Sequence, residues 1–197
     1  MGIILAPLAV GAQWAFRELA AYFYPNYPVI TSTWFFLWAA FIEESVKFLA
    51  IKFIVLHDPE FDEPVDAMVY MISAGLGFAA IENILVLFQT LPRGTEDTLS
   101  VWLLRFVGAT FLHAVSSAIV GYFLALAWFY NRHSSKLIWL GLFAATIFHF
   151  VFNIILLSSD GKPEGFYYST IFLISVAIIV SALFTKLKNQ QAKTSGE

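Results

Sequence analysis

Two adjacent glutamates lie in the middle of an apolar segment of this sequence. The stretch FIEESVKFL, residues 41–49, places Glu43, Glu44 and Lys47 inside the longer run TWFFLWAAFIEESVKFLAIKFIV. A charged side chain at the centre of a membrane helix costs about 2.5 to 3.5 kcal/mol, so these residues must face a protein or water-filled interior. Two neighbouring carboxylates in a low dielectric do not both ionise easily. A protonated glutamate beside an ionised one suits general acid and base catalysis.

Polar residues also interrupt three later apolar segments. They are Glu82 and Asn83 in GLGFAAIEN, Arg105 and His113 in RFVGATFLHAVSS, and His149 and Asn153 in FHFVFN. Counting along each helix at about 1.5 Å per residue places them near the depth of the glutamate pair. Two histidines level with two glutamates predict a functional site that could activate water.

Lys47 allows a purely structural interpretation of the glutamates. It follows Glu43 by four residues and Glu44 by three, so either carboxylate can pair with it on a helix. A buried ion pair that holds helices together is therefore the structural alternative, although a single glutamate would suffice for it. A lone histidine in a membrane helix is likewise usually a hydrogen-bonding partner between helices.

Six apolar segments must position these side chains. They are predicted at residues 3–22, 33–55, 66–89, 101–130, 137–157 and 167–184. Of 197 residues, 59% are hydrophobic and 13% charged, whereas a soluble domain carries about 25% charged residues. The sequence therefore predicts an all-α fold, a polytopic transmembrane helix bundle. Residues 3–22 also fit an interfacial or re-entrant helix, because Arg17 and Glu18 interrupt them.

The chain is predicted to form one transmembrane helical domain in the cell membrane. Residues 1–185 form this domain, its polar motifs fall in residues 41–155, and residues 186–197 form a polar, disordered cytoplasmic tail. Basic loop residues face the cytoplasm, so both termini are expected there. Six basic residues lie on one side of the bundle and two on the other: Lys52, Arg132, Lys136, Lys186, Lys188 and Lys193 against Arg93 and Lys162.

Composition and motif searches exclude several classes of protein. The chain has no cysteine, which excludes disulfides and thiolate catalysis, and its net charge of −3 gives no indication of a nucleic-acid partner. It contains no HExxH zinc helix, no GxSG serine motif and no GxGD aspartate motif. The remaining chemistry is that of glutamate and histidine.

Four motifs, in order, resemble those of the PrsW family of intramembrane proteases. They are EESVK (43–47), DEPVDAMVY leading into GLGFAAIEN (62–83), RFVGATFLHAVSSAIVG (105–121) and FHFVFN (148–153). The resemblance covers about residues 40–155 and extends to CAAX proteases and bacteriocin-processing enzymes. It implies a membrane-embedded peptidase, and the family's best-known role is the first cut in an anti-sigma factor. The active-site positions that it implies are Glu43, Glu44, His113 and His149.

The expected mechanism combines these four positions with supporting residues. Glu43 or Glu44 takes a proton from a water molecule held with the two histidines, and the water attacks a peptide carbonyl. A histidine or Asn153 donates to the developing oxyanion, and two basic residues balance charge. The supporting residues are Lys47, Glu82, Asn83, Arg105 and Asn153, of which Glu82 and Asn83 match the family's EN motif.

Two questions stay open from the sequence. No cofactor is favoured, but zinc is possible, with His113, His149 and Glu43 or Glu44 as ligands. Against a metal, the histidines lie on different segments and Lys47 would lie beside the dication. The resemblance leaves this open, since PrsW proteins are commonly labelled metalloproteases and their CAAX-type relatives are described as metal-free.

The alternative to a peptidase acting on a membrane-anchored protein or peptide is a proton-coupled transporter or a non-catalytic membrane binding protein. Intramembrane Glu and His residues also form proton relays. Transporters usually show internal repeats and broken helices, and neither is visible in this sequence. A catalytically inactive scaffold is disfavoured because every motif position is filled.

Overall fold

The computed structural model describes residues 2–26, 28–29, 32–130, 134–159 and 163–195, and in these residues it is helical without any strand. Six α-helices follow in order: α1 (Gly2–Phe23), α2 (Thr33–Ile54), α3 (Pro64–Thr90), α4 (Thr95–Ala125), α5 (Ser135–Ser158) and α6 (Pro163–Ser195). A 3-10 turn, η2 (Leu91–Arg93), joins α3 to α4, and a π-helical turn, η3 (Leu126–Tyr130), extends α4. One helix therefore corresponds to each predicted segment, which confirms the all-α fold.

Four of these helices are long and apolar enough to cross a membrane: α3, α4 from Arg105 onwards, α5 and α6. The 22-residue α2 is long enough as well, but it carries the charged EESVK motif at its centre. Those charges do not face lipid, because Glu43, Glu44 and Lys47 are all buried inside the protein. A polytopic helical bundle is the architecture that results.

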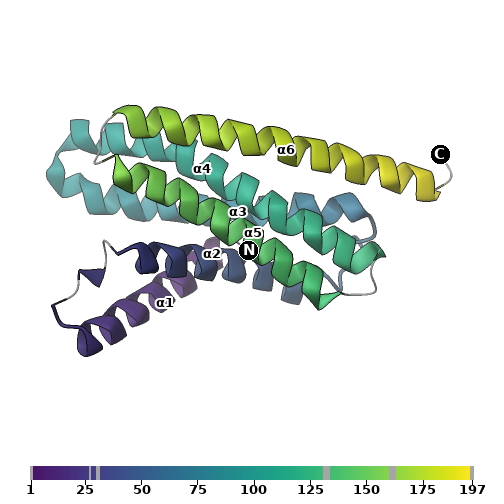
Figure 1. Ribbon diagram of the computed structural model, residues 1–197, viewed down its shortest axis with the longest axis horizontal. Helices are drawn as coiled ribbons and strands as arrows, with labels where there is room; N and C mark the ends of the chain where they lie inside the picture. The colour runs from purple at the N-terminus through teal and green to yellow at the C-terminus, as the bar shows by residue number, and fades with distance from the viewer. Residues whose placement is uncertain (1, 27, 30–31, 131–133, 160–162, 196–197) are drawn as a thin grey trace.

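Helices α3, α5 and α6 pack around α4 (Figure 1). Its most extensive contact is with α3, while α5 and α6 also pack on it; α2 packs mainly on α5, and α1 on α2 and α3. Glycine permits the close approach of α3 and α4, since a Cβ on Gly121 would lie 2.6 Å from Cα of Met68. The same helices meet beside His113, whose carbonyl oxygen would lie 2.6 Å from a Cβ on Gly75.

Local signals fix where the site-bearing helices begin. Ser32 precedes α2, and its hydroxyl accepts a 3.2 Å hydrogen bond from the backbone N–H of Phe35. Pro64 is the first residue of α3, and Asp66 accepts a 2.8 Å bond from the backbone N–H of Glu63. Gly94, with φ of 112°, provides the left-handed backbone that turns the chain into α4.

The predicted disorder of the tail is wrong, because α6 continues as far as Ser195. The sequence KLKNQQAK consists largely of good helix formers, and Leu187 within it is fully buried in the hydrophobic core. Lys186 and Lys188 on either side of it are exposed. The division into a domain and a tail, and the side of the membrane on which the loops lie, stay predictions. Arg132 and Lys162, used for that orientation, lie outside the described residues.

Candidate active site

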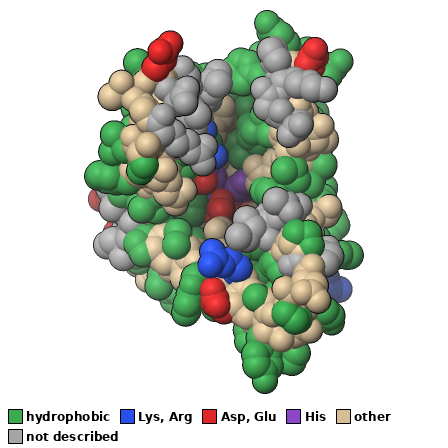
Figure 2. All heavy atoms as spheres, turned by 90° about the vertical axis from the view of Figure 1, so that its left-hand side faces the viewer, with side chains coloured by type: hydrophobic (Ala, Val, Ile, Leu, Met, Phe, Trp, Pro, Cys, Tyr) green, Lys and Arg blue, Asp and Glu red, His purple; other side chains and the backbone are tan. Residues whose placement is uncertain are grey.

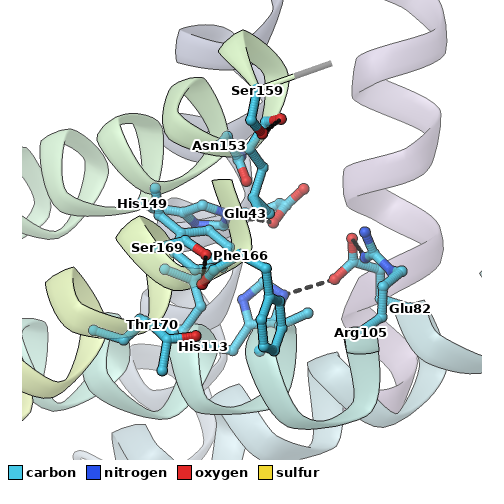
Figure 3. A pocket seen from close by; sticks show the side chains of 16 residues that line it. Glu43, Glu82, Arg105, His113, His149, Asn153, Ser159, Phe166, Ser169 and Thr170 are labelled. Atoms are coloured by element: carbon cyan, nitrogen blue, oxygen red, sulfur yellow. Dashed lines mark hydrogen bonds and ion pairs between the residues drawn. The ribbon is translucent and has the colours of Figure 1, made fainter. Parts of the chain in front are cut away.

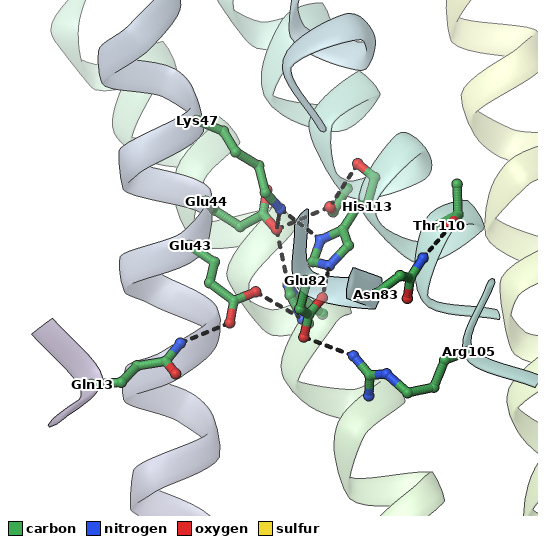
Figure 4. A network of polar contacts seen from close by, with 11 residues as sticks. Gln13, Glu43, Glu44, Lys47, Glu82, Asn83, Arg105, Thr110 and His113 are labelled. Carbon is green, nitrogen blue, oxygen red and sulfur yellow. Dashed lines mark hydrogen bonds and ion pairs between the residues drawn. The ribbon is translucent and has the colours of Figure 1, made fainter. Parts of the chain in front are cut away.

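The structure brings the polar residues of four helices into one network (Figure 4). It joins residues of α2, α3, α4 and α5 through direct hydrogen bonds, so that these residues lie side by side within the bundle. The predicted residues in direct contact are Glu43, Glu44, Lys47, Glu82, Arg105, His113 and His149. Asn153 lines the adjoining pocket. Asn83 does not join them, since its amide donates a 3.0 Å hydrogen bond to the Thr110 hydroxyl.

Glu44 is the centre of the network and is completely buried. Its Oε1 atom accepts three hydrogen bonds, from Nζ of Lys47 at 2.7 Å, Nδ1 of His149 at 2.9 Å and the hydroxyl of Ser116 at 3.0 Å. These contacts join α2 to α4 and α5. Lys47 therefore pairs with Glu44, the glutamate three residues before it. This carboxylate holds three helices together.

Glu43 has a different environment from its neighbour. Its Oε1 atom accepts a 2.8 Å hydrogen bond from the side-chain amide of Gln13 on α1. Its Oε2 atom has no hydrogen-bond partner and lies 3.7 Å from Nε2 of His149. Because Glu43 also lines the pocket, its second oxygen is the carboxylate atom available for chemistry.

Hydrogen bonds hold both histidines through their ring nitrogens. Lys47 can only donate, so Nδ1 of His113, 2.8 Å from its Nζ, must accept. Nε2 of His113 then carries the proton and donates to Oε2 of Glu82 at 2.7 Å. In His149, Nδ1 donates to Glu44, and Nε2 lies 3.7 Å from Oε2 of Glu43. Both rings are thus buried and held at a fixed orientation.

Arg105 completes the network at the edge of the pocket. Its guanidinium donates a 2.8 Å hydrogen bond to Oε1 of Glu82, and both side chains are about a third exposed, at 34% and 30%. An arginine beside Glu82 favours the ionised carboxylate that His113 requires as its acceptor. The order of contacts is therefore Arg105, Glu82, His113, Lys47 and Glu44.

A pocket of about 330 Å³ adjoins these side chains (Figure 3). Its walls are single faces of α4, α5 and α6, on which lining residues recur at helical spacing. At one end lie Glu43, Glu82, Arg105, His113, His149 and Asn153. Viewed from one end, the molecule is hollowed, and histidine and acidic side chains are visible inside the hollow (Figure 2). The polar centre is therefore accessible from outside the bundle.

Three of these residues form a group that could hold a metal ion. One ligand atom from each of Glu43, His113 and His149 lies within 4.8 Å of the others. Glu43 and His149 each present a free atom, Oε2 and Nε2. Both ring nitrogens of His113, in contrast, are already engaged by Lys47 and Glu82.

Sequence reasoning missed three features of the site. Gln13 and Ser116 contact the two glutamates, and α6 contributes residues such as Phe166 and Thr170 to the pocket wall. Gln13 could have been found because it is a polar residue within the first apolar segment. Ser116 could have been found because it follows His113 by three residues, in HAVSS, and so lies on the same helix face. The contribution of α6 has no local signal, because it depends on how the helices pack.

Comparison with known proteins shows the family of this chain. A sequence model described as PrsW family intramembrane metalloprotease matches residues 1–181. This chain belongs to the PrsW family. The Protease PrsW of Geobacillus kaustophilus is 35% identical over 141 residues, which cover 72% of this chain and 58% of that protein. The Protease PrsW of Oceanobacillus iheyensis is 34% identical over 121 residues, covering 61% of this chain and 53% of the relative.

A third PrsW relative matches over a longer stretch. The Protease PrsW of Halalkalibacterium halodurans is 30% identical over 164 residues, covering 80% of this chain and 71% of the relative. The chain spans just over half the length of the first two PrsW relatives that it matches. No solved structure matches it significantly.

Proposed function

We propose that this chain is an intramembrane endopeptidase that hydrolyses a peptide bond of a membrane-anchored protein. Membership of the PrsW family and the buried glutamate–histidine centre support this. The observation that carries the proposal is the pair formed by Oε2 of Glu43 and Nε2 of His149. These two acceptors face each other at 3.7 Å at the edge of the pocket.

This pair has the geometry to hold the attacking water. Two acceptors at that separation can each receive one proton of the same water molecule at ordinary hydrogen-bond lengths. The oxygen lone pairs of the water then point away from both, toward a substrate in the pocket. As the water attacks the carbonyl carbon, Glu43 accepts its proton and later delivers it to the leaving amine.

The remaining network keeps this pair in position. Glu44 accepts from Nδ1–H of His149, so in the neutral ring that the mechanism uses the lone pair is on Nε2. Gln13 holds one oxygen of Glu43, so that the other is directed at the histidine. Lys47 balances the charge of Glu44 in a site where an uncompensated carboxylate would be strongly disfavoured.

Asn153 is the proposed donor to the developing oxyanion. It lies on α5 one turn beyond His149 and lines the same pocket. An amide N–H directed at the tetrahedral oxygen stabilises that species more than the ground-state carbonyl, which lowers the barrier. Removing such a donor in other hydrolases costs about 2.7 to 4 kcal/mol.

The proposed mechanism is metal-independent, as the sequence favoured. Catalytic zinc sites use about three protein ligands, and in the group formed by Glu43, His113 and His149 only Glu43 and His149 present a free donor atom. His113 would have to release Glu82 or Lys47 in order to bind a metal ion. The residues as they stand therefore do not fit a resident zinc ion, and no step is derived through one.

The substrate is proposed to be a single-span or membrane-associated protein, and regulatory cleavage of an anti-sigma factor is the role suggested by the family resemblance. Purified protein in liposomes should cleave labelled single-span peptides, and Glu43→Gln in the same liposomes should not. Absence of cleavage by the wild-type protein across a diverse peptide library would refute the proposal. Proton flux without cleavage would support the transporter alternative instead.

A further inference from the structure

Gly108 on α4 is a helix glycine that packing does not explain. A Cβ at Gly121 would collide with backbone atoms of Met68 and Ala67, so glycine is needed there. A Cβ at Gly108 would meet only Cζ of Phe152 within 4 Å among the described residues, at an ordinary contact distance of 3.8 Å. Alanine would fit at position 108 and would favour the helix. Packing among the residues that the structure describes therefore gives no reason for glycine at this position.

Gly108 instead faces the pocket that contains the polar centre. It lies on the same face of α4 as Leu112, and Ala109 and His113 form the neighbouring row of that face. The walls beside it are apolar and well packed, since Ala109, Leu112 and Phe152 are 8%, 2% and 3% exposed. The space beside Gly108 is therefore an apolar hollow with fixed walls.

This hollow is close to the place where the proposed chemistry occurs. Gly108 precedes His113 by five residues, about 7.5 Å along a helix, and Phe152 follows His149 by three, about 4.5 Å. In an extended peptide, consecutive residues are about 3.3 Å apart, so side chains on one face recur at about 6.6 Å. A substrate side chain in the hollow would thus belong to a residue one or two positions from the cleaved bond.

We propose that Gly108 opens a specificity subsite, bounded by Ala109, Leu112 and Phe152, that receives a large apolar side chain of the substrate. The inference rests on the proposed peptidase function and names the class of peptide that it takes. Leucine-sized or phenylalanine-sized residues fill the subsite and desolvate its walls. A charged side chain would find no partner on Ala109, Leu112 or Phe152, so only the Arg105–Glu82 pair in the same pocket could accept one.

Cleavage specificity provides the main test. Peptides that differ only by leucine or alanine at each position near the cleaved bond are compared by kcat/KM, for the wild-type protein and for Gly108→Leu. We expect the leucine-to-alanine ratio of kcat/KM at one position to fall by roughly tenfold or more in Gly108→Leu. An apolar pocket distinguishes substrates that differ by one methylene by at least about that factor, and the new leucine side chain would occupy this pocket. An unchanged preference at every position would overturn the subsite.

Two further variants and a control distinguish a change in specificity from misfolding of Gly108→Leu. Gly108→Ala should shift the preference in the same direction by a smaller factor, and Phe152→Ala should shift it toward larger side chains such as tryptophan. Gly11→Leu is the matched control, because Gly11 is an exposed helix glycine on α1 with no described atom within 4 Å of its Cβ position. The control should keep the wild-type preference, and a shift there equal to that of Gly108→Leu would contradict the proposal.

Binding separates failure of the subsite from failure of the proposed function. The Glu43→Gln protein is incubated with single-span peptides carrying photoreactive leucine, and crosslinked sites are mapped by mass spectrometry. Crosslinks to the Gly108–Leu112 stretch or to Phe152 support the subsite even if the wild-type protein cleaves nothing, in which case only the peptidase proposal fails. Crosslinks confined to other parts of the chain, together with normal cleavage by the wild-type protein, would support the peptidase function and refute the subsite.

Discussion

Glu44 and His149, 105 positions apart in the sequence, are joined by a 2.9 Å hydrogen bond that directs Nε2 of the histidine toward Glu43. This bond separates the tasks of two glutamates that are neighbours in the chain. One oxygen of Glu44 is held by Lys47, His149 and Ser116 away from the pocket, whereas Glu43 lines the pocket with its Oε2 unpartnered. Conservative substitutions at the two positions should therefore have different consequences.

Glu43→Gln should abolish proteolysis and leave stability near the wild-type value. Glutamine has nearly the same shape, but its amide cannot accept the proton of the attacking water. Glu44→Gln should lower both activity and stability, because it removes the counter-charge of a buried lysine, and breaking such a pair costs about 3 to 5 kcal/mol. Cleavage assays and thermal unfolding in detergent distinguish these outcomes. Equal stability losses in the two variants would show that the environments have been assigned wrongly.

The Glu44–Lys47 pair should show strong energetic coupling. Lys47→Met alone leaves the carboxylate of Glu44 without its 2.7 Å partner, while the double variant Glu44→Gln/Lys47→Met removes both charges together. We expect the double variant to be more stable than the sum of the single losses predicts, with a coupling of about 1 to 3 kcal/mol. Unfolding of the four proteins under one condition measures this coupling. Simple additivity would mean that the pair contributes little.

Gln13 is predicted to be a positioning residue for Glu43. Gln13→Leu removes the 2.8 Å hydrogen bond to Oε1, so that the carboxylate can rotate away from His149. A hydrogen bond to a charged group contributes about 1.5 to 3 kcal/mol, so kcat should fall roughly tenfold or more with a smaller change in KM. The exposed neighbour Trp14, changed to leucine, is the control on the same helix. If both variants have the same kcat, α1 has no part in aligning the base.

Metal removal should leave the activity unchanged. Purified protein should contain less than one equivalent of zinc by elemental analysis, and exhaustive chelation should not reduce cleavage. The reason is that His113 has no free ring nitrogen while it contacts Lys47 and Glu82. Stoichiometric zinc whose removal stops cleavage, and whose return restores it, would instead make Glu43, His113 and His149 the ligands.

The orientation in the membrane can be tested by labelling, because the chain has no cysteine of its own. Single cysteines at the exposed positions Ser135 and Thr95 lie at the starts of α5 and α4. The asymmetry of basic loop residues predicts that an impermeant reagent labels Ser135→Cys from the cytoplasm and Thr95→Cys from outside. Both should react once the membrane is permeabilised. The opposite pattern would invert the predicted topology.

The sequence alone determined the helices and the polar residues that meet between α2, α3, α4 and α5. Long apolar runs separated by polar turns specify six helices, because backbone groups in lipid must be satisfied within each helix. The charged residues inside those runs could not face lipid, so their meeting at one depth followed from counting along each helix. The sequence prediction missed the end of α6 because the segment is polar. Its residues are nevertheless mostly good helix formers, and one of them, Leu187, is buried.

Tertiary structure alone decided what each of these residues contacts. Helical spacing allowed Lys47 to pair with either glutamate, and only the rotation of α2 against α4 and α5 selected Glu44. The same rotation left Glu43 to Gln13 and the pocket, and the packing of α6 on α4 and α5 closed the pocket wall. Spacing along one helix is a local property, whereas the partner of a buried side chain depends on neighbouring helices distant in the sequence.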